Sequence, residues 1–269
     1  MEAFLNYGFL QRALFAGIFV AVACALLGVF LILRRDAMIG HGLAHITFAG
    51  VALGLLLNVI PLAMALGIAV LAALGIMKLK EKAGLHGDTA IAIFSSTGFA
   101  LGIILATLAG SFSVDLFGYL FGDILTIQES EVWLSIGLAA VVVFTVVLYY
   151  RKFMYMTFDL ESAKASGIKV GYLDVILTVL TAVTIVLGMK VVGILMVSAL
   201  VVIPAAAGLQ LASNFKQAII LSSIIAVISV LLGLLFAFYL DLPASGTIVI
   251  LSFLFFCFCF LLKRGKKFF

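Results

Sequence analysis

Two histidines, His41 and His45, are the residues whose type and spacing suggest chemistry in this sequence. Side chains four positions apart share one face of a helix, so the two imidazoles can bind one metal ion together. Neutral imidazole is a common zinc ligand. The spacing also matches the zinc-protease motif HExxH, but Gly42 stands where that motif has its general-base glutamate. We therefore expect metal handling without hydrolysis, and no catalytic residue is predicted.

The chain that carries this pair is strongly apolar. Of its 269 residues, 66% are hydrophobic and 10% are charged. A helix needs about 20 apolar residues to cross a bilayer. Nine runs approach that length, near 13–33, 41–60, 62–77, 88–110, 133–150, 172–189, 191–211, 217–240 and 245–262. The expected fold class is all-α, a polytopic membrane helical bundle that forms one domain over residues 1–269.

The number of crossings is predicted as eight or nine. Residues 188–190 are the only break between two of the runs, and a single broken helix there would reduce nine crossings to eight. The segment 116–127 is too short to cross and is expected to be re-entrant or interfacial. Basic residues favour the cytoplasmic side. With the first helix ending inside, every one of the 16 basic residues except Arg12 and Lys190 lies inside.

This orientation puts several acidic residues outside the cell, including Asp123 and Asp241. An acidic external mouth would attract cations. Solvated loops explain the same pattern equally well, and the sequence does not separate the two.

The cytoplasmic loop at about 151–171 is the second informative stretch. Asp159 can cap a short helix from Leu160 to about Ser166, and Gly167 can end it. Glu161 falls in the first turn, where the helix dipole favours an acid. Such a helix between two crossings serves either as a docking element for another protein or as an ordinary structured loop.

The chain has no phosphate-binding loop of the form G-x-x-x-x-G-K-[ST], so it cannot bind ATP by that route. Energy for pumping must come from a partner or from an ion gradient. The second possibility, an ion-coupled secondary transporter for a metal or a small solute, is the alternative function. A membrane metalloenzyme is a third, weakened by the glycine at position 42. No nucleic-acid partner is expected.

Five blocks in order, almost end to end, resemble the metal-uptake ABC permease family, the membrane subunits of zinc, manganese and iron importers. They are Arg34-Arg35 with 39–45 and 49–52, then 119–125, then 158–163 with Gly167, then 192–195 with 202–206, and finally 243–246.

The resemblance implies a type II ABC importer fold, like that of the cobalamin importer, in the plasma (inner) membrane of a prokaryote. Two permease copies would pair above two ATPase subunits, which use the ATP, and below an extracellular or periplasmic metal-binding protein. It further implies that the ATPase contact, the coupling loop, includes Phe158, Asp159, Glu161, Ala163 and Gly167. His41 and His45 would be a transient site for transported Zn²⁺ or Mn²⁺, with no permanently bound cofactor.

One position departs from the family pattern. The family usually has aspartate where this chain has His41, while histidine is kept at position 45. Two imidazoles are softer ligands than a carboxylate and an imidazole, which favours zinc over manganese. The expected function is the permease subunit of an ATP-driven divalent metal importer that prefers zinc.

Overall fold

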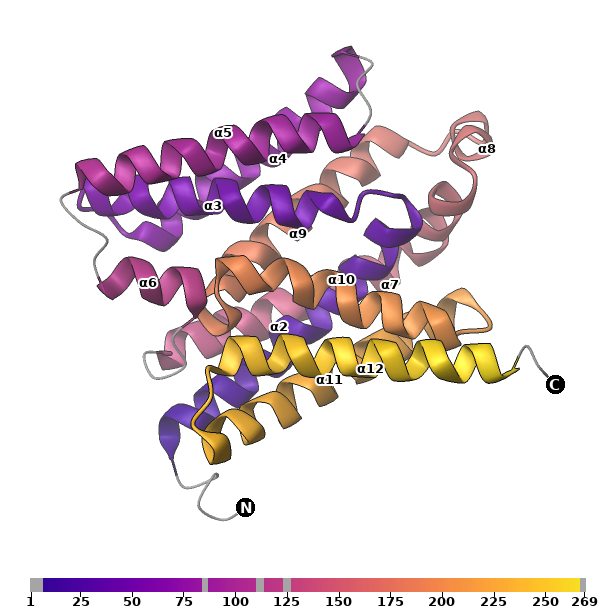
Figure 1. Ribbon diagram of the computed structural model, residues 1–269. Coiled ribbons are helices and arrows are strands. Elements are labelled where there is room, and N and C mark those ends of the chain that lie inside the picture. The colour runs from indigo at the N-terminus through magenta and orange to yellow at the C-terminus, as the bar shows by residue number, and fades with distance from the viewer. Residues whose placement is uncertain (1–6, 84–86, 110–113, 123–126, 267–269) are drawn as a thin grey trace.

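The chain folds as a bundle of long helices (Figure 1). The computed structural model describes residues 7–83, 87–109, 114–122 and 127–266. The helices in this part are α2 (Gly8–Leu33), α3 (Met38–Leu56), α4 (Pro61–Ala83), α5 (Gly87–Leu108), α6 (Val114–Phe121), α7 (Glu129–Phe158), α8 (Leu160–Ala165), α9 (Val170–Val192), α10 (Ile194–Leu211), α11 (Phe215–Leu240) and α12 (Ala244–Lys266).

Eight of the described helices are long and apolar enough to cross a membrane, and α10 provides a shorter apolar segment. The break between α9 and α10 is not at 188–190 as predicted, because α9 continues to Val192 and ends at Gly193. From Gly193, α10 runs back along the bundle, so α2 begins and α12 ends at opposite ends of the molecule (Figure 1). This arrangement agrees with the nine-run interpretation. The short α6 is consistent with a segment that does not cross.

Glycines allow the helices around α3 to approach closely. A Cβ at Gly50 would lie 2.6 Å from the Cα of Ala65 on α4. A Cβ at Gly98 on α5 would lie 2.9 Å from the Cα of Ile46 on α3. Small residues at helix contacts are a general feature of membrane bundles. Helix α3 is thereby held tightly between α4 and α5.

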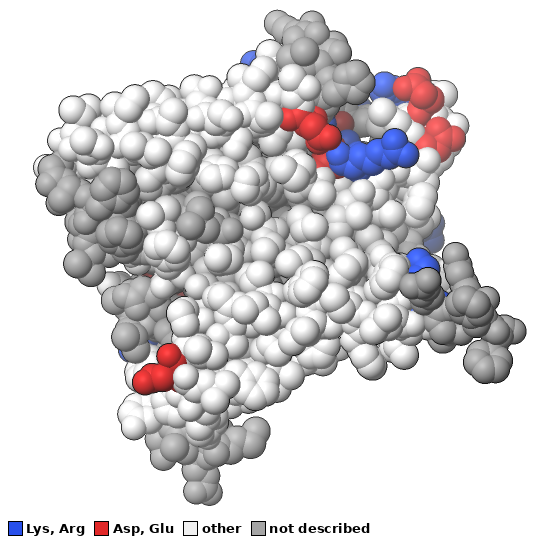
Figure 2. Space-filling model, viewed as in Figure 1, with Lys and Arg blue, Asp and Glu red and all other residues white. Residues whose placement is uncertain are grey.

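The space-filling view shows charged side chains near the ends of the bundle and a broad band without them between (Figure 2). Several buried hydroxyl groups within the bundle donate to carbonyl oxygens of their own helix. Thr47 donates to the carbonyl of Leu43, and Ser229 donates to that of Ile225. These bonds satisfy polar groups that have no water to bond with inside a bilayer.

Candidate metal site and coupling loop

His41 and His45 lie in the first two turns of α3. Helix α3 begins at the end of the bundle that also carries α8 (Figure 1). Their Nε2 atoms are 3.1 Å apart. The ring centroids are 4.5 Å apart, with the rings edge to face. His41 is exposed and His45 is partly buried. The predicted pairing of the two side chains on one helix face is therefore what the structure shows.

The separation of the two nitrogens suits a shared metal ion. Two Zn–N bonds at a tetrahedral angle would place the nitrogens about 3.3 Å apart. The observed 3.1 Å is close enough for small side-chain rotations to accommodate an ion. Within the described residues, no group of three or more His, Cys, Asp and Glu side chains could hold a metal. The pair thus offers two ligands and leaves the remaining positions to water or to other groups.

The packing of α3 against α5 explains the glycine between the histidines. A Cβ at Gly42 would lie 2.6 Å from Cγ2 of Ile91, a residue of α5. Real Cβ atoms do not approach other atoms so closely. A glutamate at position 42 would therefore require Ile91 to shift, so this helix contact disfavours the side chain that the zinc-protease motif requires.

Aromatic packing orients His45. The ring of Phe99, on α5, lies edge to face with the imidazole at a centroid distance of 5.0 Å. The ring of Phe48 also packs against Phe99, with the two ring centroids 5.7 Å apart. The Nδ1 atom of His45 is buried and has no hydrogen-bond partner among the described residues. Metal-binding histidines usually donate this second ring N–H to a carboxylate or carbonyl. Here the ring is held by contact with an aromatic ring instead.

The coupling loop has the predicted local structure. The carboxylate of Asp159 accepts a hydrogen bond of 2.9 Å from the backbone N–H of Ser162 and caps α8. Hydrogen bonds from the side chain and then the backbone of Ser162 hold the pKa of Asp159 below its ordinary value. At the other end Gly167 has φ +77°, and its N–H donates to the carbonyl of Lys164. The N–H of Ile168 reaches back to Ala163, which completes a Schellman motif.

The side chains of this loop face different ways. Phe158 is 65% exposed, and the exposed Glu161 pairs with Lys164 at 3.3 Å. Ala163 is fully buried, so it packs α8 onto the bundle and presents no surface to a partner. The exposed surface around α8 therefore includes Phe158 and Glu161 and excludes Ala163.

Of the two acidic residues that are expected outside the cell, Asp241 lies within the described residues. Asp241 is exposed and follows the last residue of α11, in the left-handed conformation with φ 57° and ψ 40°. The junction of α11 and α12 lies at the end of the bundle opposite α8 (Figure 1). Asp123 lies outside the described residues.

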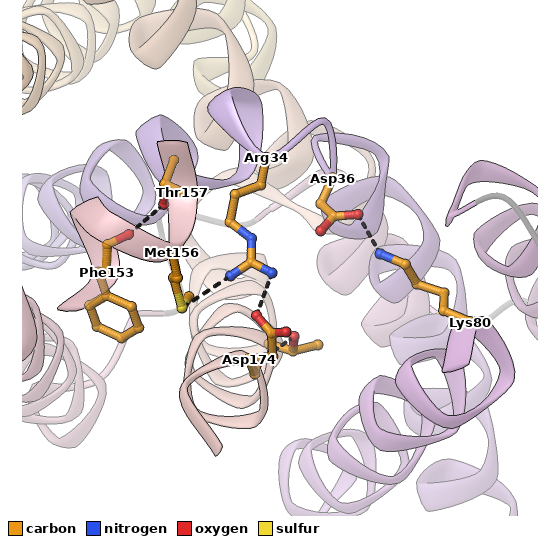
Figure 3. A network of polar contacts seen from close by, with 8 residues as sticks. Arg34, Asp36, Lys80, Phe153, Met156, Thr157 and Asp174 are labelled. Carbon is orange, nitrogen blue, oxygen red and sulfur yellow. Dashed lines mark hydrogen bonds and ion pairs between the residues drawn. The ribbon is translucent and has the colours of Figure 1, made fainter. Parts of the chain in front are cut away.

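Sequence reasoning missed a group of charged residues that the fold brings together. Arg34 forms an ion pair with Asp174, and Asp36 forms one with Lys80 (Figure 3). One signal was present in the sequence. Asp174 falls inside the apolar run 172–189, and an ionisable residue within a crossing suggests a functional role by default.

Comparisons with known proteins show which family has this sequence and this helical bundle. A family model described as the ABC 3 transport family matches residues 6–263. The chain is a member of the ABC 3 transport family. The predicted family and fold class are confirmed.

Individual relatives of this ABC 3 family chain cover nearly its whole length. It is 33% identical over 270 residues to the manganese transport system membrane protein MntC of Listeria monocytogenes, covering 100% of this chain and 96% of that protein. It is 32% identical to the high-affinity zinc uptake system membrane protein ZnuB of Haemophilus influenzae, covering 95% and 96%. The structure of PsaBC from Streptococcus pneumoniae in complex with Fab aligns with a TM-score of 0.87 and 32% identity, covering 96% of this chain and 93% of that one.

Proposed function

We propose that this chain is the permease subunit of a bacterial ABC importer for a divalent metal, residing as a multi-pass protein in the plasma membrane. Family membership supports a membrane transport subunit and not an enzyme. Relatives named for manganese transport and for zinc uptake support a metal as cargo. The single observation that carries the proposal is the pair of Nε2 atoms 3.1 Å apart on α3.

We further propose that zinc is preferred over manganese. The support is the chemistry of the pair, because two imidazole nitrogens are softer ligands than one carboxylate and one imidazole. Relatives of both kinds exist, and the first of those above is named for manganese. The preference therefore rests on His41 in this chain and not on overall similarity.

The proposed energy source is ATP hydrolysis by separate ATPase subunits that dock on α8 and the exposed residues around it. A metal-binding protein would deliver the ion on the opposite face, and a second permease copy would complete the path. Because α8 lies between α7 and α9 along the chain, movement of the ATPases would reach both helices. Alternating access to the histidine pair would follow from that movement.

The test is metal uptake into liposomes that contain the chain with its ATPase and binding protein. Zinc is compared with manganese, each with and without ATP. We expect ATP-dependent zinc uptake that is lost in His41→Ala and His45→Ala. The matched control is His86→Ala, which removes a histidine outside the pair and should leave uptake unchanged.

Each other outcome contradicts one part of the proposal. Faster uptake of manganese than of zinc would refute the proposed preference for zinc and leave the proposal of a metal importer intact. Uptake at the same rate with and without ATP would favour the alternative function, an ion-coupled secondary transporter. Normal uptake by both histidine variants, at a normal membrane level, would show that the pair is not the metal site.

A further inference from the structure

Arg34 lies at the centre of a partly buried ionic cluster. One terminal nitrogen of its guanidinium forms an ion pair with Asp174, and the other donates to Sδ of Met156 at 3.7 Å (Figure 3). The side chains of Arg34 and Asp174 are 13% and 25% exposed. Nearby, Nζ of Lys80 is 2.5 Å from a carboxylate oxygen of Asp36. The cluster lines a cavity of about 80 Å³ between α2, α3, α4 and α9.

The two partners of Arg34 come from the helices on either side of the coupling loop. Met156 lies in the last turn of α7, which ends at Phe158. Asp174 is the fifth residue of α9, which begins at Val170. Helix α8 is the only helix between them. One guanidinium therefore contacts both helices that flank α8, and it will follow any movement that α8 imposes on them.

The backbone after Arg34 is a tight turn that leads directly into α3. Arg35 has φ 60°, and its N–H donates to the carbonyl of Ile32. The N–H of Asp36 donates to the carbonyl of Leu31 at 2.8 Å, and the N–H of Ile39 donates to Asp36. The backbone N–H groups of Arg34, Arg35 and Asp36 are thus each held by a local hydrogen bond to the end of α2. A displacement of Arg34 is expected to be passed on to the first turn of α3.

Stability alone is a poor explanation for this cluster. A buried ion pair gains little over apolar residues of similar volume, because both charges must first be removed from water. The planar guanidinium offers two donor edges, so it can contact two helices at once in a fixed geometry. The cluster is better suited to linking helices than to strengthening the bundle.

We propose that Arg34 is a positioning residue that transmits movement of α8 to the start of α3, where the histidine pair lies. The proposal rests on the proposed function, since it assumes that ATPases move α8. It assigns to Arg34, Met156 and Asp174 a mechanical role distinct from metal binding and from ATPase docking.

The experiment uses the chain assembled with its ATPase and follows a reporter thiol. Met38 is the first residue of α3 and is 50% exposed, so Met38→Cys places a thiol close to the histidine pair. Cys24, Cys257 and Cys259 are first replaced by alanine. The rate of labelling by a water-soluble maleimide is measured with and without ATP. We expect ATP to change this rate in the parent, and we expect Arg34→Gln to abolish the change.

Three comparisons separate this role from a purely structural one. Arg35→Gln alters the adjacent exposed arginine, for which no ion pair occurs among the described residues, and should keep the response to ATP. Asp174→Asn keeps the size of the side chain and should also lose the response to ATP. It provides a second test of the inference if Arg34→Gln does not fold. Co-purification and ATP hydrolysis by the partner should persist in each variant, because the exposed face around α8 is unchanged.

A response to ATP that persists in both Arg34→Gln and Asp174→Asn would overturn the inference and leave the proposed function intact. A parent complex that hydrolyses ATP without any change at position 38 would leave no movement for Arg34 to transmit, and would also overturn it. Failure of the ATPase to associate with the parent would instead refute the proposed function on which the inference rests.

Discussion

Replacing Gly193 with alanine should destabilise the bundle, because two independent costs meet at this one residue. Gly193 is the link between α9 and α10 and has φ 85° and ψ 153°, a conformation that is essentially restricted to glycine. A Cβ there would lie 2.4 Å from the carbonyl carbon of Phe121 and 2.5 Å from the carbonyl oxygen of Leu120. These are backbone atoms at the end of α6, so no side-chain rotation can relieve the overlap.

The magnitude follows from the two costs. This sparsely populated backbone conformation costs about 1–3 kcal/mol for a residue with a Cβ. Forcing extra volume into a packed site costs about 1–3 kcal/mol more. Gly193→Ala should therefore reduce the free energy of unfolding by about 2–6 kcal/mol, as the sum of those costs.

The assay is unfolding of the purified chain in mixed detergent micelles with increasing sodium dodecyl sulfate, followed by circular dichroism. Gly137→Ala is the matched control, because Gly137 lies inside α7 and a Cβ there would meet nothing within 4 Å. The control should be neutral or stabilised by up to about 1 kcal/mol. If Gly193→Ala unfolds within about 0.5 kcal/mol of the parent, the size of a benign surface change, the close contact with α6 is wrong.

Other variants test the site and the loop. Gly167→Pro removes the N–H that bonds to Lys164 and imposes a negative φ, so co-purification with the ATPase should fall sharply, and by less in Gly167→Ala. Hydrogen bonds from the side chain and then the backbone of Ser162 lower the pKa of the Asp159 carboxyl. The stabilisation of α8 by this carboxylate is therefore present above the ordinary carboxyl range and is lost as pH falls through the folded pKa, below about pH 4. Hydrogen exchange of α8 amides should show this pH dependence, and Asp159→Asn should lose it. His41→Asp should raise the ratio of manganese to zinc uptake in liposomes, because a carboxylate is a harder ligand than imidazole. Phe99→Leu should weaken zinc binding in a calorimetric titration without changing the membrane level, because His45 loses the ring that orients it.

The features that were predictable from sequence are those encoded locally. Runs of apolar residues mark the membrane helices, and the cap at Asp159 with the turn at Gly167 follows from residue type and spacing. The sequence indicates a break at 188–190, three residues before Gly193, because Lys190 is a polar signal whereas Gly193 lies between two apolar residues. Hydropathy responds to polarity and not to backbone conformation, so it favoured the wrong position.

Features that depend on tertiary contact could not be predicted. Arg34 and Asp174 are far apart in the sequence, and nothing local indicates that they pair. The burial of Ala163 depends on which side of α8 meets the bundle, and six residues are too few for a clear periodicity. The aromatic support of His45 by Phe99 depends on how α3 and α5 pack together.

The Nδ1 of His45, which has no hydrogen-bond partner in the part of the chain that the structure describes, affects how long a metal ion would stay bound. A hydrogen-bonded imidazole is a more basic ligand, and loss of such a partner typically lowers metal affinity by about 10–100-fold. A protein that stores metal must keep each ion bound for a long time, whereas a protein that conducts metal must bind each ion weakly enough to release it quickly. A hydrogen-bond acceptor engineered beside Nδ1 would raise the metal affinity of the pair. The chain would then bind its cargo and no longer release it.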